Sequence, residues 1–526
     1  MAISADYHAG VFQPQNEIRN ALRKGRFFWT IEFVPSSDHI LNDDLVTVDS
    51  FVRALARRPE VAGFSVTDRV HSDNDPDPVM MAKHIRDHAG TQPLIHWSGK
   101  DRSMTDFESS LDAMVAAKLE NILLLTGDKL KTPPSDRRPR YLESVTAIKL
   151  AKDKHPDLLI ASALNPFKYR EEEAMAQYLK LGKKIYAGTD FIITQIGFDI
   201  KKFEEALFWM DTRDYRVPMV ANVMALTAAR SRYIRKHQLA GVTITDSYHE
   251  FLQQEAELFP EQAPARVLRR TALLISGLRM LGYSGVQLTA IHTVDQLMTL
   301  QKQIDYLARK CPDRVSWNKA WQEALTLPKG FSADPVPGNA WYMSSHMINR
   351  PTSHASLTDR IKYRTMKWSH SFLFDRGLGA KVLSGLVKNI KRHSKADKIL
   401  ERIERLIKAP LFGCETCGMC RLAETQYICP ETCPKGLANG ACGGTNNNIC
   451  EYGDRECIHS RKYRIAKDAN VLSQLEQWLI PSVPDEARHT SSWPPHFRGE
   501  GPSIDKPDCE SGDRLKSVPE GMADDI

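Results

Sequence analysis

A series of short apolar segments, each followed by an amphipathic stretch, constrains the fold of this chain more than any other feature. Eight segments read as buried strands: 27–34, 62–67, 93–98, 121–126, 158–163, 191–195, 218–224 and 286–291. Helical patterns lie between them, at 43–55, 79–88, 106–118, 141–151, 171–186 and 201–210. Most steps between strands have the length of a βα unit. Eight units predict an α/β fold, a closed (β/α)8 TIM barrel, better than an open doubly wound sheet with a Gly-rich dinucleotide turn.

The residues at the carboxyl ends of these strands are unusually polar. In chain order they include Glu32, Thr67, Asp68, His96, Gly127, Asp128, Asn165, Gln195, Asn222 and Gln287. Each one alone is more simply explained as a loop residue or helix cap. A barrel would bring them all to one mouth, where barrel enzymes carry their chemistry.

Glu32 stands out because it interrupts the aromatic and β-branched run 27–35. A carboxylate in such a strand must be paired, or protonated with a raised pKa. The stretch alone leaves two interpretations open, a functional group and a structural ion pair.

The rest of the chain divides by composition. We predict an N-terminal arm (1–25), the barrel (26–309), a linker rich in Pro and Gly (310–356), a helical and cysteine-rich domain (357–480), and a disordered tail (481–526).

Composition excludes little. Hydrophobic and charged contents of 42% and 26% suit a globular protein, and the net charge of +6 suits small anions as well as nucleic acid. No secretory signal or membrane span is evident, so we expect a cytoplasmic protein without membrane or nucleic-acid partners. Basic residues crowd segment 360–408; a solvated helix face is the first interpretation and a surface for an acidic partner the second. The sequence also leaves open whether the chain forms a homo-oligomer.

Eight of the ten cysteines gather in one region: Cys414, Cys417, Cys420, Cys429, Cys433, Cys442, Cys450 and Cys457. Without an export signal such a cluster indicates metal rather than disulfides. The spacing leaves an iron-sulfur cluster and zinc both open. Eight thiolates could complete two four-ligand sites.

Four strand ends, 31–35, 64–67, 124–128 and 187–195, resemble the methylenetetrahydrofolate reductase family of flavin barrels over residues 26–305. The cysteine-rich region resembles the C-terminal domain that is fused to, or partnered with, some of these reductases. The resemblance implies FAD in the barrel and a folate substrate.

The resemblance also implies roles for individual residues. Glu32 resembles the family's general acid, Asp128 the carboxylate beside flavin and folate, and Gln195 a folate-binding residue. Flavin-contacting positions correspond to Thr67, His96, Gly127, Asp128, Tyr141 and Lys184. Lys183 and Lys184 can neutralise the flavin phosphates.

Departures from the family pattern bear on the electron donor. Thr126 replaces an arginine, and Ala228 and Ala229 align where the family has a stacking aromatic. We therefore expect poor direct use of NAD(P)H. Two roles of the appended domain stay open: electrons pass through it or through an electron-transfer protein partner, or it binds a structural zinc that only folds a small cap.

These patterns together predict a flavoprotein that interconverts 5,10-methylene- and 5-methyltetrahydrofolate. Two alternatives stay open: a non-catalytic scaffold that carries a metal domain for an electron-transfer complex, and a zinc-thiolate methyltransferase acting on folate.

Overall fold

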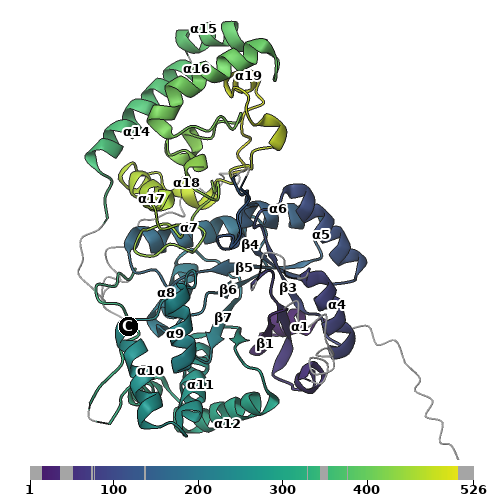
Figure 1. Cartoon of the computed structure of the whole chain (residues 1–526), viewed down its shortest axis with the longest axis vertical. Helices are drawn as coiled ribbons and strands as arrows, with labels where there is room; N and C mark the ends of the chain where they lie inside the picture. The colour runs from purple at the N-terminus through teal and green to yellow at the C-terminus, as the bar shows by residue number, and fades with distance from the viewer. Residues whose placement is uncertain are drawn as a thin grey trace, which may run out of the picture.

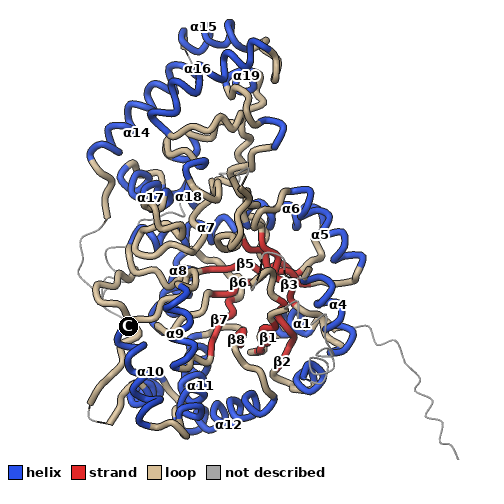
Figure 2. Tube along the Cα trace, in the orientation of Figure 1, coloured by secondary structure: helices blue, strands red, loops and turns tan. Residues whose placement is uncertain are grey.

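A closed parallel barrel forms the larger part of the molecule (Figures 1 and 2). The computed structural model describes residues 15–35, 51–70, 72, 75, 77–135, 138–328, 330–343, 353–375 and 377–506. The strands are β1 (Phe28–Phe33), β2 (Val61–Val66), β3 (Leu94–Ser98), β4 (Asn121–Leu125), β5 (Leu159–Leu164), β6 (Phe191–Thr194), β7 (Met219–Met224) and β8 (Gly285–Thr289). Each strand pairs with the next, and β8 returns to β1 in the register Phe28 to Gly285. The predicted (β/α)8 barrel is confirmed.

Helices alternate with the strands and surround them. They are α1 (Glu17–Arg23), α4 (Pro78–Ala89), α5 (Met104–Ala116), α6 (Ser144–Lys154), α7 (Glu171–Tyr186), α8 (Ile200–Thr212), α9 (Ala228–His237), α10 (Asp246–Leu258), α11 (Ala263–Leu281) and α12 (Val294–Lys310). The predicted helix 43–55 falls largely outside the described residues, although residues 51–56 are helical.

Side chains fill the amino-terminal end of the barrel. Phe28, Leu94 and Phe191 pack together inside it, and α1 covers them with Ile18 and Ala21. All six residues of β2 are buried, as expected for a parallel strand covered on both faces. This end is a packed core, so only the carboxyl ends of the strands are open to carry chemistry.

The C-terminal domain lies over α6 and α7 at one side of the barrel (Figure 1). It contains α14 (Leu357–His370), the π-helical turn η1 (Ser371–Asp375), α15 (Leu378–Val387), α16 (Lys395–Phe412), α17 (Ile458–Asp468), α18 (Leu472–Gln477) and α19 (Trp493–Phe497). Short 3-10 turns occur at η2 (Ala423–Thr425), η3 (Pro430–Thr432) and η4 (Asp485–Ala487). Helices α17 and α18 pack directly on α7.

Two segments differ from their sequence interpretations. Residues 481–506, assigned to a disordered tail, contain η4 and α19 and bury Ala487, Thr490 and Ser491. Polar composition misled the prediction because the ordering comes from contacts with distant helices. Residues 507–526 of that tail lie outside the described part of the chain.

The predicted linker 310–356 contains α13 (Arg314–Ala324), which packs on α11. The indole of Trp317 donates a hydrogen bond of 2.7 Å to the carbonyl of Leu273, so this part extends the barrel. Across the described ranges, no helix combines the length and apolarity needed to span a membrane.

Candidate functional site at the barrel mouth

Glu32 lies at the carboxyl end of β1 and is half-buried. Its Oε2 accepts hydrogen bonds from Gln287 Nε2 at 3.1 Å and Thr289 Oγ1 at 3.0 Å, both from β8. Burial raises the pKa of Glu32, although these two hydrogen bonds act to lower it. Both of these donors are neutral, so among the described residues Glu32 does not form the structural ion pair that was its alternative interpretation.

A chain of hydrogen bonds links Glu32 to His96 across the mouth. Gln287 Oε1 accepts from Ser65 Oγ at 2.9 Å, and Ser65 Oγ is 2.5 Å from His96 Nε2. Because a hydroxyl has one hydrogen, His96 must donate to Ser65 when Ser65 donates to Gln287. Burial lowers the pKa of His96 to about 4, so the ring is neutral at pH 7. The chain therefore runs in one direction and ends at Glu32.

Not every polar strand end serves the mouth. Asp68, after β2, accepts from the amide of Ser98 at 2.7 Å and from Arg102 at 2.6 Å. The Asp68 carboxylate is fully buried. Asp68 and Arg102 therefore form a structural ion pair that holds the loops after β2 and β3 together.

The turn after β4 is built around Gly127, whose φ is +87°. A Cβ at Gly127 would lie 2.1 Å from Ser98 Oγ and 2.4 Å from Lys100 Cγ, so only glycine fits. The C-terminal domain docks on this turn. Lys435 Nζ donates to the Gly127 carbonyl at 2.8 Å, and Glu451 accepts from the Lys129 amide.

Asp128 extends from the same turn and is exposed. The surrounding protein nevertheless raises its pKa, and the negative charge of Glu451 adds to this effect. Lys435 and Glu451 form an ion pair beside it. Tyr141 closes the turn by accepting from the Leu130 amide at 3.1 Å, and its hydroxyl is 3.3 Å from that of Tyr452.

Gln195 and Asn165 form a second group at the mouth, after β6 and β5. Asn165 Nδ2 donates to the carbonyls of Gly241 and Gly443, each at 3.0 Å. Gln195 Nε2 donates to the Ala240 carbonyl at 3.3 Å. The cysteine-rich domain, through Gly443, thus reaches the barrel mouth at two separate turns.

The lysines of α7 lie under the C-terminal domain. Lys183 is fully buried with its Nζ 3.4 Å from Asn439 Oδ1, and Lys184 donates to the Ala163 carbonyl. Burial lowers the pKa of both amines, that of Lys184 to about 7. Lys180 pairs with Glu143 at 3.0 Å.

These positions allow a test of how well a flavin would fit. Thr67 Oγ1 is buried and has no hydrogen-bond partner among the described residues, so an acceptor or donor on a ring could satisfy it. Together with His96 and Gly127 it fits the ring portion of a flavin. Lys183 does not fit the flavin phosphates, because the C-terminal domain covers it, and the lowered pKa values of Lys183 and Lys184 weaken their charge.

The cysteines fall into two neighbouring sets. Cys414, Cys417, Cys420 and Cys429 line one small cavity of about 20 Å³, the volume that a single ion or water would fill. In the second set, the charge of Cys442 raises the pKa of Cys433, Cys450 and Cys457 in addition to the effect of burial. Within the described ranges no three His, Cys, Asp or Glu side chains are positioned to hold a metal ion. Metal binding by the cysteines thus stays a prediction.

The fold and mouth define a class: a (β/α)8 barrel with a protonatable carboxylate at the end of its first strand. The model of the family "Methylenetetrahydrofolate reductase" matches residues 17–299, and "Methylene-tetrahydrofolate reductase C terminal" matches residues 393–483. The chain therefore belongs to the methylenetetrahydrofolate reductase family, with that family's C-terminal domain fused to it. This membership places it among folate-related oxidoreductases.

Comparison with solved structures adds only distant likenesses. An uncharacterized Clostridium thermocellum protein that binds two copies of 5-methyl-5,6,7,8-tetrahydrofolic acid is 12% identical, with a TM-score of 0.42; the match covers 55% of this chain and 98% of that one. Oxaloacetate acetylhydrolase with 3,3-difluorooxalacetate is 11% identical, with a TM-score of 0.31, covering 59% and 94%. The search of curated proteins returned no match.

Sequence reasoning missed the residues that the C-terminal domain brings to the mouth. Lys435, Glu451 and Tyr452 contact residues about 300 positions earlier, and no local pattern marks them. Ser65 and Thr289 were also missed. Both residues lie within one position of the carboxyl end of a strand, and this position could have identified them in the sequence.

Proposed function

We propose that this protein interconverts 5,10-methylenetetrahydrofolate and 5-methyltetrahydrofolate as a flavin-dependent oxidoreductase. Glu32 carries the proposal: a carboxyl of raised pKa, supported by neutral donors, at the mouth of a barrel of this family. Opening the folate five-membered ring requires a proton on the departing nitrogen, and a carboxyl whose pKa is raised by burial is suited to supply it.

Thr289 supports both protonation states of Glu32. Its hydroxyl lies 3.0 Å from Glu32 Oε2 and 2.9 Å from Asn222 Oδ1, but it has one hydrogen to donate. When Glu32 is ionised, Thr289 can donate to it. When Glu32 is protonated, the carboxyl can donate to Thr289, which then donates to Asn222. Thr289 and Asn222 thus hold Glu32 both before and after it loses its proton.

The flavin ring would lie against Thr67, His96 and Gly127 at the ends of β2, β3 and β4. Bound there, flavin supplies the hydride chemistry that no side chain can. Asp128 stands beside this place to stabilise positive charge that develops on the folate, and Gln195 offers an amide to the pterin.

A second candidate function, a non-catalytic scaffold, is favoured by one observation: the C-terminal domain covers Lys180 and Lys183 of α7 through Gly440 and Asn439. Colour separates the candidates. The oxidoreductase purifies with a flavin absorption spectrum or acquires one on incubation with FAD or FMN, whereas the scaffold shows no flavin absorption in either case.

Substitution of Glu32 tests the chemistry. With chemically reduced flavin protein and methylenetetrahydrofolate, Glu32→Gln should bind flavin normally and lose at least about 100-fold in turnover. The exposed Glu261→Gln variant is the matched control. Turnover by Glu32→Gln equal to that of the control would exclude Glu32 as the acid.

A further inference from the structure

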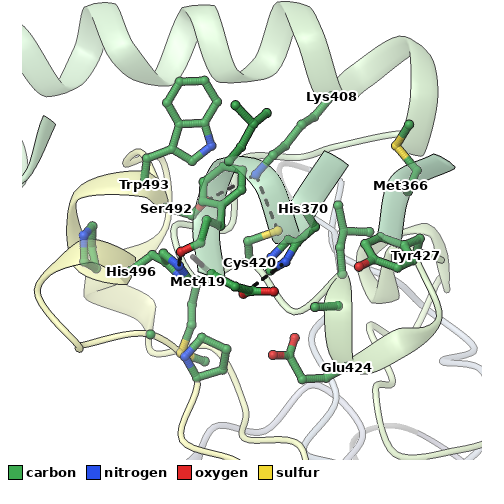
Figure 3. A pocket seen from close by; sticks show the side chains of 18 of the residues that line it. Met366, His370, Lys408, Met419, Cys420, Glu424, Tyr427, Ser492, Trp493 and His496 are labelled. Carbon is green, nitrogen blue, oxygen red and sulfur yellow. Dashed lines mark hydrogen bonds and ion pairs between the residues drawn. The ribbon is translucent and has the colours of Figure 1, made fainter. Parts of the chain in front are cut away.

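The C-terminal domain contains a cavity of about 400 Å³ that is separate from the barrel mouth and has Cys420, of the first cysteine set, in its wall (Figure 3). Its walls come from the end of α14, the π-helical turn η1, α16, segment 418–427 and segment 492–502. Every lining residue belongs to this domain. The volume is within the range of small-molecule sites, and π-helical turns are frequent at functional positions.

Aromatic rings form much of the cavity wall. Phe374, on η1, lies 5.2 Å from the His370 ring, 6.1 Å from the Trp493 ring and 5.4 Å from the His496 ring, measured between centroids. Tyr427 contacts His370 at 6.2 Å. Rings disposed in this way offer flat surfaces to a planar ligand.

Two polar atoms in the wall lack partners among the described residues. Glu424 Oε2 and Trp493 Nε1 are both buried without a hydrogen bond. A buried polar atom left in this state has lost its hydrogen bond to water and destabilises the fold. A ligand that donates to Glu424 and accepts from Trp493 would recover this energy. Figure 3 shows the Glu424 carboxylate on the opposite side of the cavity from Trp493.

Lys408 restricts the charge of the ligand. Its ammonium donates to Glu404 at 2.6 Å and lies 3.4 Å from both Cys420 Sγ and Ser492 Oγ, so its three N–H groups are occupied. It also lies 5.9 Å from the Trp493 ring centroid. Lys408 already supplies the cation beside the Trp493 ring, and Glu404 balances its charge. A cationic ligand would compete with Lys408 at this ring, so a neutral ring fits better.

We propose that this cavity binds a fused heteroaromatic ring through a 2-amino-4-oxopyrimidine edge, as found in pterins and guanines. The amino group and ring N–H of that edge are adjacent donors suited to the Glu424 carboxylate. The ring nitrogens and the 4-oxo group supply acceptors for Trp493. An isoalloxazine fits less well, because its N–H lies between two carbonyls that would face the carboxylate.

The test measures binding of 6-methylpterin and of guanosine to the full-length protein by calorimetry. We expect one equivalent to bind at this cavity, and Glu424→Gln and Trp493→Phe each to weaken it at least 10-fold. Glu486→Gln, an exposed change in the same domain, is the matched control. Near-ultraviolet circular dichroism identical to that of the control establishes that the variants are folded.

Glu32→Gln changes the barrel site and not this cavity, so the variant should still bind one equivalent of probe in the C-terminal domain. Tighter binding of guanosine than of 6-methylpterin would identify a nucleotide as the source of the ring. Absence of binding by both probes, unchanged affinity in folded Glu424→Gln, or loss of all binding in Glu32→Gln would each overturn the proposal. None of these results depends on turnover at the barrel mouth.

Discussion

Glu32 carries a cost that should be measurable apart from catalysis. Its pKa is raised in the folded protein, so the ionised form destabilises the fold by about 1.4 kcal/mol for each unit of the shift. This penalty is complete above the folded pKa and disappears as the pH falls through that pKa to the ordinary value of a glutamate.

We predict that Glu32→Gln, which removes the penalty, raises the free energy of unfolding at pH 8 and has no such effect at pH 4. Chemical denaturation at the two pH values measures it. A variant that is less stable than wild type at pH 8 would contradict the raised pKa.

Gly127 permits a second measurement at the residue scale. Gly127→Ala should destabilise the protein by about 2 kcal/mol or more, because the added Cβ meets Ser98 and Lys100 and φ is positive. Gly25→Ala is the control: its φ is +60°, but nothing lies within 4 Å of the new Cβ. If thermal unfolding shows the same loss of stability for both variants, the Gly127 turn has no close contact with Ser98 and Lys100.

Helix α7 is the element through which the two domains meet. Glu143, which precedes α6, accepts from the amides of Ala438 and Asn439 and pairs with Lys180 of α7. Burial acts to raise the pKa of Glu143, but Lys180 and the Asn439 amide outweigh it, and the net pKa is lowered. The pair therefore stabilises docking at neutral pH, and this contribution is lost as the pH falls through the lowered pKa.

We predict that Glu143→Gln weakens docking by about 3 kcal/mol, because Lys180 is left buried without its partner. Hydrogen exchange of residues 435–445 should accelerate in this variant. Glu204→Gln, which breaks an exposed ion pair with Arg314, should cost less than about 1 kcal/mol and leave that exchange unchanged.

At the scale of the whole molecule, the thiols should couple metal content to domain docking. If a metal ion binds among Cys414, Cys417, Cys420 and Cys429, its removal should unfold the cysteine loops while the barrel stays folded. Cys417→Ser should lower metal content by elemental analysis and increase proteolysis after residue 357. Cys311→Ser, at the end of α12 in the barrel, is the control. Equal metal content in the two variants would contradict the assignment.

The architecture was largely readable from the sequence because barrel strands are short, apolar and regularly spaced. Predicted segments 27–34 and 121–126 correspond to β1 and β4 within one residue at each end. Segment 481–506 was not readable, since its order depends on burial against distant helices and its local composition is polar.

The sequence by itself determined the barrel, the position of Glu32 at a strand end and the separate cysteine-rich region, because these follow from local periodicity and spacing. Only the tertiary structure decided which groups meet. It placed Lys435 and Glu451 on the Gly127 turn, covered the α7 lysines, and sorted the cysteines into two sets. Such contacts join residues hundreds of positions apart, and their energies depend on burial that no local pattern encodes.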